Sequence, residues 1–163
     1  MEHSTGERVV AVIARVFFGN DAKLERQDSF VDLGAGYMDG IRLAMALNRE
    51  FDVDISDDDA KKMRTVGDTI DCVNNLLTGK RVVAIVAEQL GIRKSEAVRE
   101  ARFREDFGID SLDEIELALQ LSEDFDIPIP DEDAVGLLTV GDAIDYVVKK
   151  LSGPQLELQA DGT

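Results

Sequence analysis

The chain has 163 residues and a net charge of −16, from 34 acidic and 18 basic residues. A nucleic-acid-binding protein needs basic side chains to neutralise phosphates, and an anionic membrane surface repels an acidic chain, so we expect no nucleic-acid partner and no membrane insertion. A protein with a basic surface is the charged partner that this composition favours.

The sequence has few of the groups that catalysis requires. The single cysteine, Cys72, cannot form an intrachain disulfide and lies on an apolar helical stripe, where it is expected to be a core residue. The single histidine, His3, lies in a polar N-terminal segment without a signal-peptide layout, and the apolar run 9–14 is too short to span a bilayer. We therefore predict a cytoplasmic protein that is not an enzyme and has no metal site.

The first predicted element is an amphipathic helix, preceded by an S-x-x-E capping box at 4–7. Its apolar residues recur at helical spacing: Val9, Val12, Ile13, Val16 and Phe17. A long polar connection follows at about 20–36. Because so long a structureless segment is unusual in a compact domain, we expect its apolar residues to anchor it on the core. These anchors are Leu24, Phe30 and Leu33.

Two further helices are predicted in the first half, at about 37–51 and from Thr65 to about Leu77, where T-x-x-D can cap the helix start. Between them, a short turn or helix is predicted after DVDISDDD at 52–59. Helices of the same kind are predicted in the second half at 81–91, 111–125, 131–137 and 140–151.

An internal repeat explains this order. Residues 33–77 align with 107–151 without a gap, with nearly half of the pairs identical. Such a match indicates duplication of a unit of roughly 75 residues, in too few copies for a solenoid. Gly79 suits the end of a helix, so we predict domains at 1–79 and 80–152 in mutual contact, with a flexible tail at 153–163.

A serine begins the acidic helix of the second copy, in the stretch FGIDSLDEIEL at 107–117. Ser111 to Glu114 fits the S-x-x-E capping pattern, and a cap worth roughly 1 kcal/mol would explain the serine by itself. The surroundings favour a function, because no Lys or Arg occurs from Glu105 to Val148. Such like-charge crowding does not stabilise a helix, whereas it suits a surface that docks a basic partner.

The helix 111–125 carries apolar residues on two sides, and one helix of a small bundle can hardly bury both. The stripe expected in the core consists of Leu117, Leu121 and Phe125. The second stripe consists of Leu112, Ile115 and Leu119, rimmed by Asp113, Glu114 and Glu116. An apolar centre with a charged rim predicts a partner-docking face, unless the long connection covers it.

The second copy resembles an acyl carrier protein, particularly the discrete bacterial type of fatty-acid synthesis. The resemblance covers 81–151 and is carried by the (L/F)-G-x-D-S-L signature at 107–112, the acidic helix behind it, and FDIPIPDE at 125–132. It implies an all-α protein of two tandem four-helix bundles, each with a long first loop.

In that family the serine of D-S-L carries a 4′-phosphopantetheine arm through a phosphodiester. The resemblance implies attachment at Ser111, flanked by Asp110 and Leu112, by a phosphopantetheinyl transferase that uses coenzyme A. A helix N-terminus tolerates the phosphodiester charge. The resemblance also implies acyl-transfer enzymes with basic patches as partners, and an acyl chain sheltered by Leu117, Leu121, Phe125 and Ile129.

The first copy lacks the attachment hydroxyl, because Gly36-Tyr37-Met38 stands where the second copy has Asp-Ser-Leu. We expect a folded domain that cannot accept the arm, and that docks on its neighbour, recognises partners or stabilises the second domain. Its outer stripe is retained as Met38, Ile41 and Met45, and methionines suit adaptable contacts.

Three interpretations of the whole chain stay open. It carries acyl thioesters among fatty-acid or polyketide-type enzymes, or it carries aminoacyl or peptidyl groups, or it is an interaction scaffold in which Ser111 is only a cap. The strongly acidic helix and IPIPDED at 127–133 favour the acyl carrier.

Overall fold

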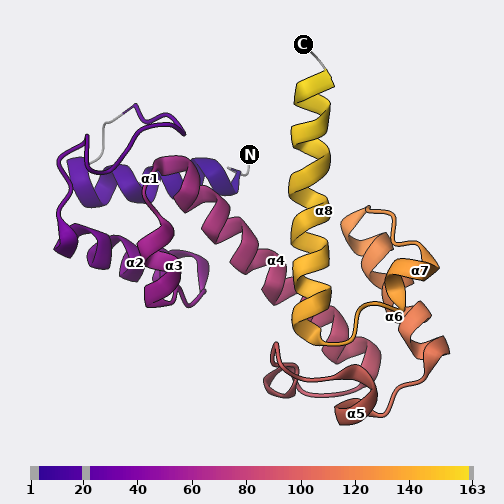
Figure 1. Ribbon diagram of the computed structural model, residues 1–163. Coiled ribbons are helices and arrows are strands. Elements are labelled where there is room, and N and C mark those ends of the chain that lie inside the picture. Colours follow the sequence, from indigo (N-terminus) through magenta and orange to yellow (C-terminus); the bar gives the residue numbers. More distant parts are fainter. Residues whose placement is uncertain (1–3, 20–22, 162–163) are drawn as a thin grey trace. The chain divides into compact units, whose positions relative to one another are not determined.

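A computed structural model describes residues 4–19 and 23–161, with only the backbone described for 153–161. His3 lies outside these residues. The described residues form helices and contain two isolated β-bridges but no strand. The chain divides into two compact units, Met1–Leu77 and Thr78–Thr163 (Figure 1). The predicted all-α fold of two tandem bundles is confirmed.

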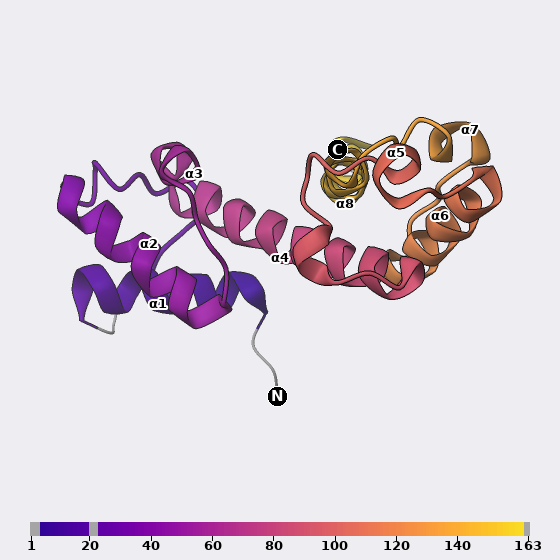
Figure 2. The same cartoon turned by 90° about the horizontal axis from the view of Figure 1, so that it is seen from below.

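Unit 1 contains α1 (Thr5–Phe18), α2 (Tyr37–Phe51), α3 (Asp57–Lys62) and the first part of α4 (Val66–Leu90). Helices α1 and α2 lie side by side (Figures 1 and 2). The predicted capping box of α1 is confirmed, because Ser4 Oγ accepts from the Glu7 N–H at 3.1 Å and the Glu7 carboxylate accepts from the Ser4 N–H at 3.0 Å. Val9, Val12 and Ile13 of the α1 stripe are buried in one core with Leu43 and Leu47 of α2, and Val16 and Phe17 are partly buried against it.

Unit 2 contains the rest of α4, the 3₁₀ helix η1 (Lys94–Glu96), α5 (Phe103–Phe107), α6 (Ser111–Phe125), α7 (Asp131–Ala134) and α8 (Val140–Asp161). The two short helices η1 and α5 were not predicted and lie within the long connection. The helix α8 includes 153–161, where the sequence predicted a tail without regular structure. No helix within 4–19 and 23–161 has both the length and the apolarity to cross a bilayer.

The predicted helix end at Gly79 is wrong, because α4 continues through it and belongs to both units. A glycine inside a helix costs about 1 kcal/mol relative to alanine, which does not break a helix when no proline or left-handed residue follows. A Cβ atom at Gly79 would lie 3.6 Å from Ile144 of α8, an ordinary packing distance.

The long connection of each unit packs against the last helix, as its apolar anchors predicted. Phe103 is buried, and its N–H donates to the Leu138 carbonyl at 3.0 Å. The Gly141 N–H donates to the Arg99 carbonyl at 2.9 Å, and a Cβ atom at 141 would lie only 3.0 Å from that oxygen. This close approach favours glycine and recurs at Gly67, which accounts for the glycine of TVGD in both copies.

Cys72 lies at the edge of the unit 1 core, as predicted. Burial raises the pKa of its thiol from 9.0 to about 11, with a further contribution from the Asp59 carboxylate. The folded state therefore holds the thiol proton more tightly than the unfolded state. The contribution of Cys72 to the free energy of unfolding is complete below pH 9 and is lost as the pH rises through about 11.

We therefore predict that alkylation of Cys72 in the folded chain is about 100-fold slower at pH 8 than in the unfolded chain, since the thiolate is the reactive form. Iodoacetamide labelling followed by mass spectrometry between pH 7 and about pH 11 measures the rate. The chain in denaturant is the control. A folded chain that labels as fast as the unfolded one would contradict the raised pKa.

Candidate functional site

The start of α6 is capped by Asp110 and not by Ser111. Asp110 has extended backbone, its Oδ1 accepts from the Asp113 N–H at 3.0 Å, and the Asp113 carboxylate accepts from the Asp110 N–H at 3.2 Å. Ser111 is the first residue of the helix and is exposed. The interpretation of Ser111 as the N-cap is wrong, because the capping box lies one residue earlier. The Ser111 hydroxyl therefore has no part in starting the helix.

An arginine that sequence reasoning missed lies beside this hydroxyl. Arg104, on α5, donates from Nη2 to Ser111 Oγ at 3.3 Å. The same guanidinium donates to both carboxylate oxygens of Glu114, at 2.5 Å from Nε and 3.0 Å from Nη2. These bonds raise the pKa of Arg104 above its ordinary value, chiefly because Glu114 accepts from it, so the arginine stays charged.

Glu114 is not part of the charged rim that the sequence predicted. Only 5% of the residue is exposed, because its side chain turns inward to Arg104. A buried carboxylate is costly unless it is paired, and Arg104 supplies that pair. Glu116 is exposed as predicted, and Asp113 is half-buried by its role in the capping box.

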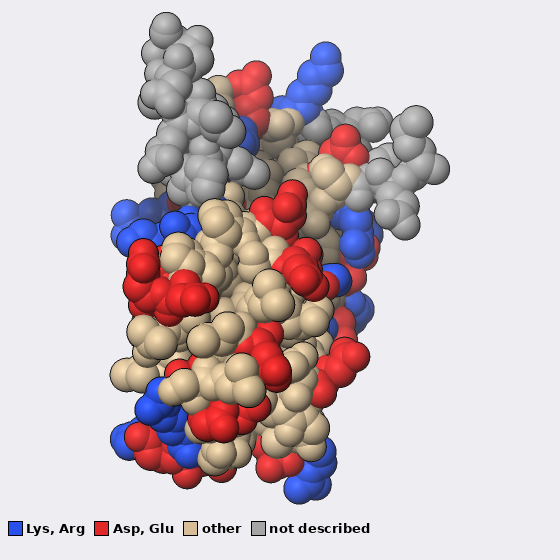
Figure 3. Space-filling view, turned by 90° about the vertical axis from the view of Figure 1, so that its right-hand side faces the viewer, with Lys and Arg blue, Asp and Glu red and all other residues tan. Residues whose placement is uncertain are grey.

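The second apolar stripe of α6 is open to solvent. Leu112, Ile115 and Leu119 are 63%, 36% and 58% exposed, so the long connection does not cover them. Figure 3 shows the side of unit 2 that carries α6 and α7, where acidic side chains alternate with uncharged ones and basic side chains lie toward the edges. The exposure matches the prediction, and docking on this stripe stays a prediction.

The four residues suggested as walls for an acyl chain divide into two groups. Leu117 and Leu121 are fully packed in the core of unit 2, while Phe125 and Ile129 are partly buried against it. All four contact the core that holds the bundle together, and a role toward an acyl chain stays a prediction.

Unit 1 starts α2 at the aligned position, but it has Gly36 and Tyr37 where unit 2 has Asp110 and Ser111. Gly36 stands at the cap position of α2 and has no side chain to offer, although the Asp39 carboxylate still accepts from the Gly36 N–H at 2.9 Å. Tyr37 follows at the serine position and is 84% exposed. The outer stripe of Met38, Ile41 and Met45 is exposed as well.

The family described as "Phosphopantetheine attachment site" matches the chain twice, over residues 7–73 and 80–147. The chain belongs to this family. The resemblance to the acyl carrier protein family is confirmed, and the cofactor of the family is covalently attached 4′-phosphopantetheine. Both units therefore have the family's fold, and they differ at the residue after the α2 or α6 cap, which is Tyr37 in unit 1 and Ser111 in unit 2.

Two solved structures are similar to this chain. "Mupirocin didomain ACP" is 12% identical with a TM-score of 0.41, and the match covers 93% of this chain and 100% of that chain. "Solution structure of the apo doublet acyl carrier protein from prodigiosin biosynthesis" is 18% identical with a TM-score of 0.37, and the match covers 96% and 88%.

The residues at the start of α6 fit a phosphodiester. The Ser111 hydroxyl is exposed, it lies at the positive end of a helix, and the Arg104 guanidinium is within hydrogen-bond distance of it. Asp110 and Leu112 flank this hydroxyl, and Asp110 forms the helix cap.

We predict that removing the cap and removing the serine have different effects on stability. Asp110→Ala is expected to destabilise unit 2 by about 1 kcal/mol, because a helix donor loses its acceptor. Ser111→Ala is expected to change stability by less than about 0.5 kcal/mol. Hydrogen exchange of the α6 amides measures the stability of unit 2 separately from that of unit 1. Equal losses in the two variants would restore Ser111 as a structural cap.

Proposed function

We propose that this chain is an acyl carrier protein that holds acyl groups as thioesters on a 4′-phosphopantetheine arm at Ser111. It delivers them to fatty-acid or polyketide-type enzymes in the cytoplasm. The observation that carries this proposal is that Asp110 caps α6, which leaves the Ser111 hydroxyl exposed and without a structural task. The chain is a carrier and not itself an enzyme.

The arm supplies a terminal thiol that holds the acyl group. The protein supplies the remaining functions. Ser111 provides the attachment oxygen, the N-terminal turn of α6 and Arg104 provide positive potential beside it, and the buried residues Leu117 and Leu121 keep α6 fixed in the bundle. Shelter of the acyl chain beside Phe125 and Ile129 belongs to the same proposal.

The exposed stripe of α6 is the proposed docking face for the transferase and for acyl-transfer enzymes. Leu112, Ile115 and Leu119 offer apolar contacts, and Asp113 and Glu116 offer negative charge to a basic patch. Apolar contacts supply affinity, and complementary charge speeds association and selects the partner.

We propose that unit 1 is a partner domain that cannot be loaded. Tyr37 replaces the serine, and a phenol on a larger side chain holds its oxygen elsewhere. The exposed methionine stripe gives unit 1 a recognition surface of its own. The alternative of a pure scaffold needs Ser111 to be the helix cap, but Asp110 is the cap. A carrier of aminoacyl or peptidyl groups is a second candidate, and identifying the group on the arm distinguishes it from an acyl carrier.

We predict that the chain gains one phosphopantetheinyl group when incubated with coenzyme A and a broad-specificity phosphopantetheinyl transferase. Intact-mass spectrometry measures the gain. Ser111→Ala is expected to gain none, and Tyr37→Phe is expected to load like the wild type. A wild-type chain that gains nothing would support the scaffold, and two added groups would show that unit 1 is also loaded.

We further predict that Leu119→Asp raises the KM of the transferase for this chain about tenfold, because a charge in the apolar centre of a docking face is costly. The matched control is Met45→Asp, the equivalent exposed position in unit 1, which is expected to leave KM unchanged. Equal effects of the two substitutions would mean that the stripe of α6 is not the specific docking face.

A further inference from the structure

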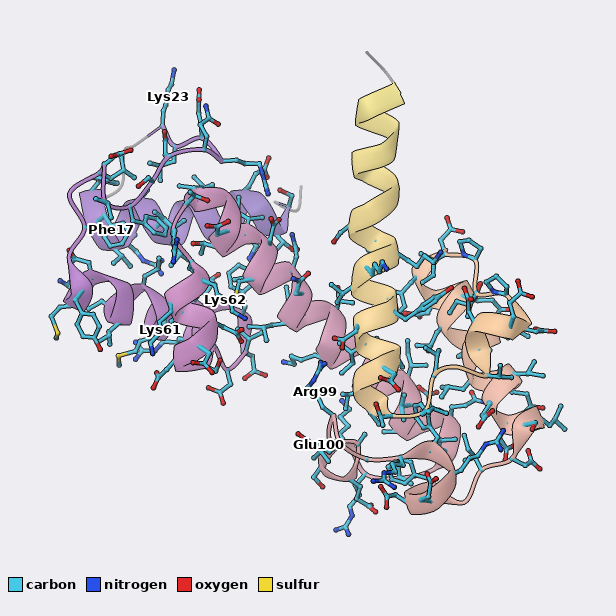
Figure 4. All side chains as sticks on the ribbon, viewed as in Figure 1. Phe17, Lys23, Lys61, Lys62, Arg99 and Glu100 are labelled. Atoms are coloured by element: carbon cyan, nitrogen blue, oxygen red, sulfur yellow. The ribbon has the colours of Figure 1, made fainter. Side chains whose placement is uncertain are left out.

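Two arginine–carboxylate pairs occur at equivalent places in both units. In unit 1 they are Arg8–Glu50 and Arg26–Asp71, and in unit 2 they are Arg81–Asp124 and Arg99–Asp145. Figure 4 shows Arg99 beside the first turns of α8, where it contacts Asp145 at 2.8 Å. Because these pairs are present whether or not a unit has the serine, they belong to the fold.

The pair of Arg104 and Glu114 is different, because it has no counterpart in unit 1. The residue aligned with Arg104 is Val31, which is 81% exposed, and the residue aligned with Glu114 is Gly40. Unit 1 nevertheless forms α2 with the same length as α6. The bundle therefore does not need this pair, although unit 2 buries a carboxylate to keep it.

The Arg104–Glu114 pair lies beside the Ser111 hydroxyl. Glu114 holds the guanidinium with two hydrogen bonds, and Arg104 Nη2 also donates to Ser111 Oγ at 3.3 Å. About half of the Arg104 side chain remains exposed on the outer surface. The arginine, the buried glutamate and the serine are present together in one unit and absent together from the other.

We propose that Arg104, held by Glu114, is a positioning residue for attachment of the arm at Ser111. This inference rests on the proposed function of Ser111. In the attachment step, Ser111 Oγ forms a bond to the phosphorus that bears the pantetheine of coenzyme A. The bond from that phosphorus to the adenosine bisphosphate breaks, and this leaving group takes the electron pair. The hydroxyl proton passes to a base on the transferase.

Arg104 acts on this step in two ways. Its N–H occupies a lone pair of Oγ, so the hydroxyl hydrogen is turned away from the protein and toward the base. Its positive charge lies beside the oxygen atoms of the phosphorus that becomes bonded to Oγ, where negative charge gathers as the bond forms. Glu114 fixes the guanidinium in advance, so little reorganisation is needed during the reaction.

Loading kinetics of the full chain test this inference. Arg104→Met with Glu114→Met removes both charges and leaves apolar side chains of similar length, so no charge is buried unpaired. The double variant is expected to lower kcat roughly 10- to 100-fold, with KM unchanged because the exposed stripe of α6 is intact. Arg104→Lys retains the charge and is expected to recover part of the rate.

The matched control is Arg99→Met with Asp145→Met, which removes a pair of the same kind in the same unit and is expected to leave kcat unchanged. Circular dichroism confirms that each variant is folded. A double variant at Arg104 and Glu114 that loads at the wild-type rate would overturn the inference, as would an equal fall in the control. A wild-type chain that is never loaded would instead overturn the proposed function.

A second measurement does not depend on rates. The side-chain N–H signal of Arg104 in NMR spectra is expected to move when the wild-type chain is loaded, because its neighbour becomes a phosphodiester. The corresponding signal of Arg99 is expected to stay in place. If loading leaves the Arg104 signal unchanged, the guanidinium does not contact the attached group, and the inference fails.

Discussion

The carboxylate of Asp110 determines what Ser111 can do. Each helix begins with N–H groups that need acceptors, and a serine at such a place usually supplies one. Here Asp110 accepts from the Asp113 N–H and Asp113 returns the bond to Asp110. The structural and the chemical tasks are thus divided between adjacent residues, so the hydroxyl can be consumed by a covalent bond without releasing the first turn of α6.

In unit 2, acidic and basic residues are separated along the sequence but form ion pairs in the folded structure. The segment from Glu105 to Val148 contains no basic residue, yet three arginines from α4 and the connection neutralise carboxylates of that segment. They are Arg81, Arg99 and Arg104. Glu116 is exposed on α6 and presents its charge to solvent or to another protein.

Local signals in the sequence predicted much of the fold. The bounds of α2 and α6 follow from apolar periodicity and capping residues, and TVGD identified the last helix of each unit. The helix end predicted at Gly79 is wrong because a single glycine does not stop a helix. The placement of Glu114 on the rim was wrong because helical spacing alone puts it there, while its ion pair depends on how α5 packs beside α6. The simultaneous change to Val31 and Gly40 in the first copy was the available signal for this pair.

Unit 1 differs from unit 2 at the cap, at the residue aligned with Ser111 and at both members of the arginine–glutamate pair. Under the proposed function, the substitutions that would match unit 1 to unit 2 at this site are Val31→Arg, Gly36→Asp, Tyr37→Ser and Gly40→Glu, and a Cβ atom at Gly40 would meet no neighbour. Taken singly, the changes bring little, since a serine without its cap and cation is poorly prepared and a lone glutamate lacks its arginine. Under the proposed function, a hydroxyl placed at position 37 by a single substitution would therefore lack both the carboxylate cap and the cation that accompany Ser111.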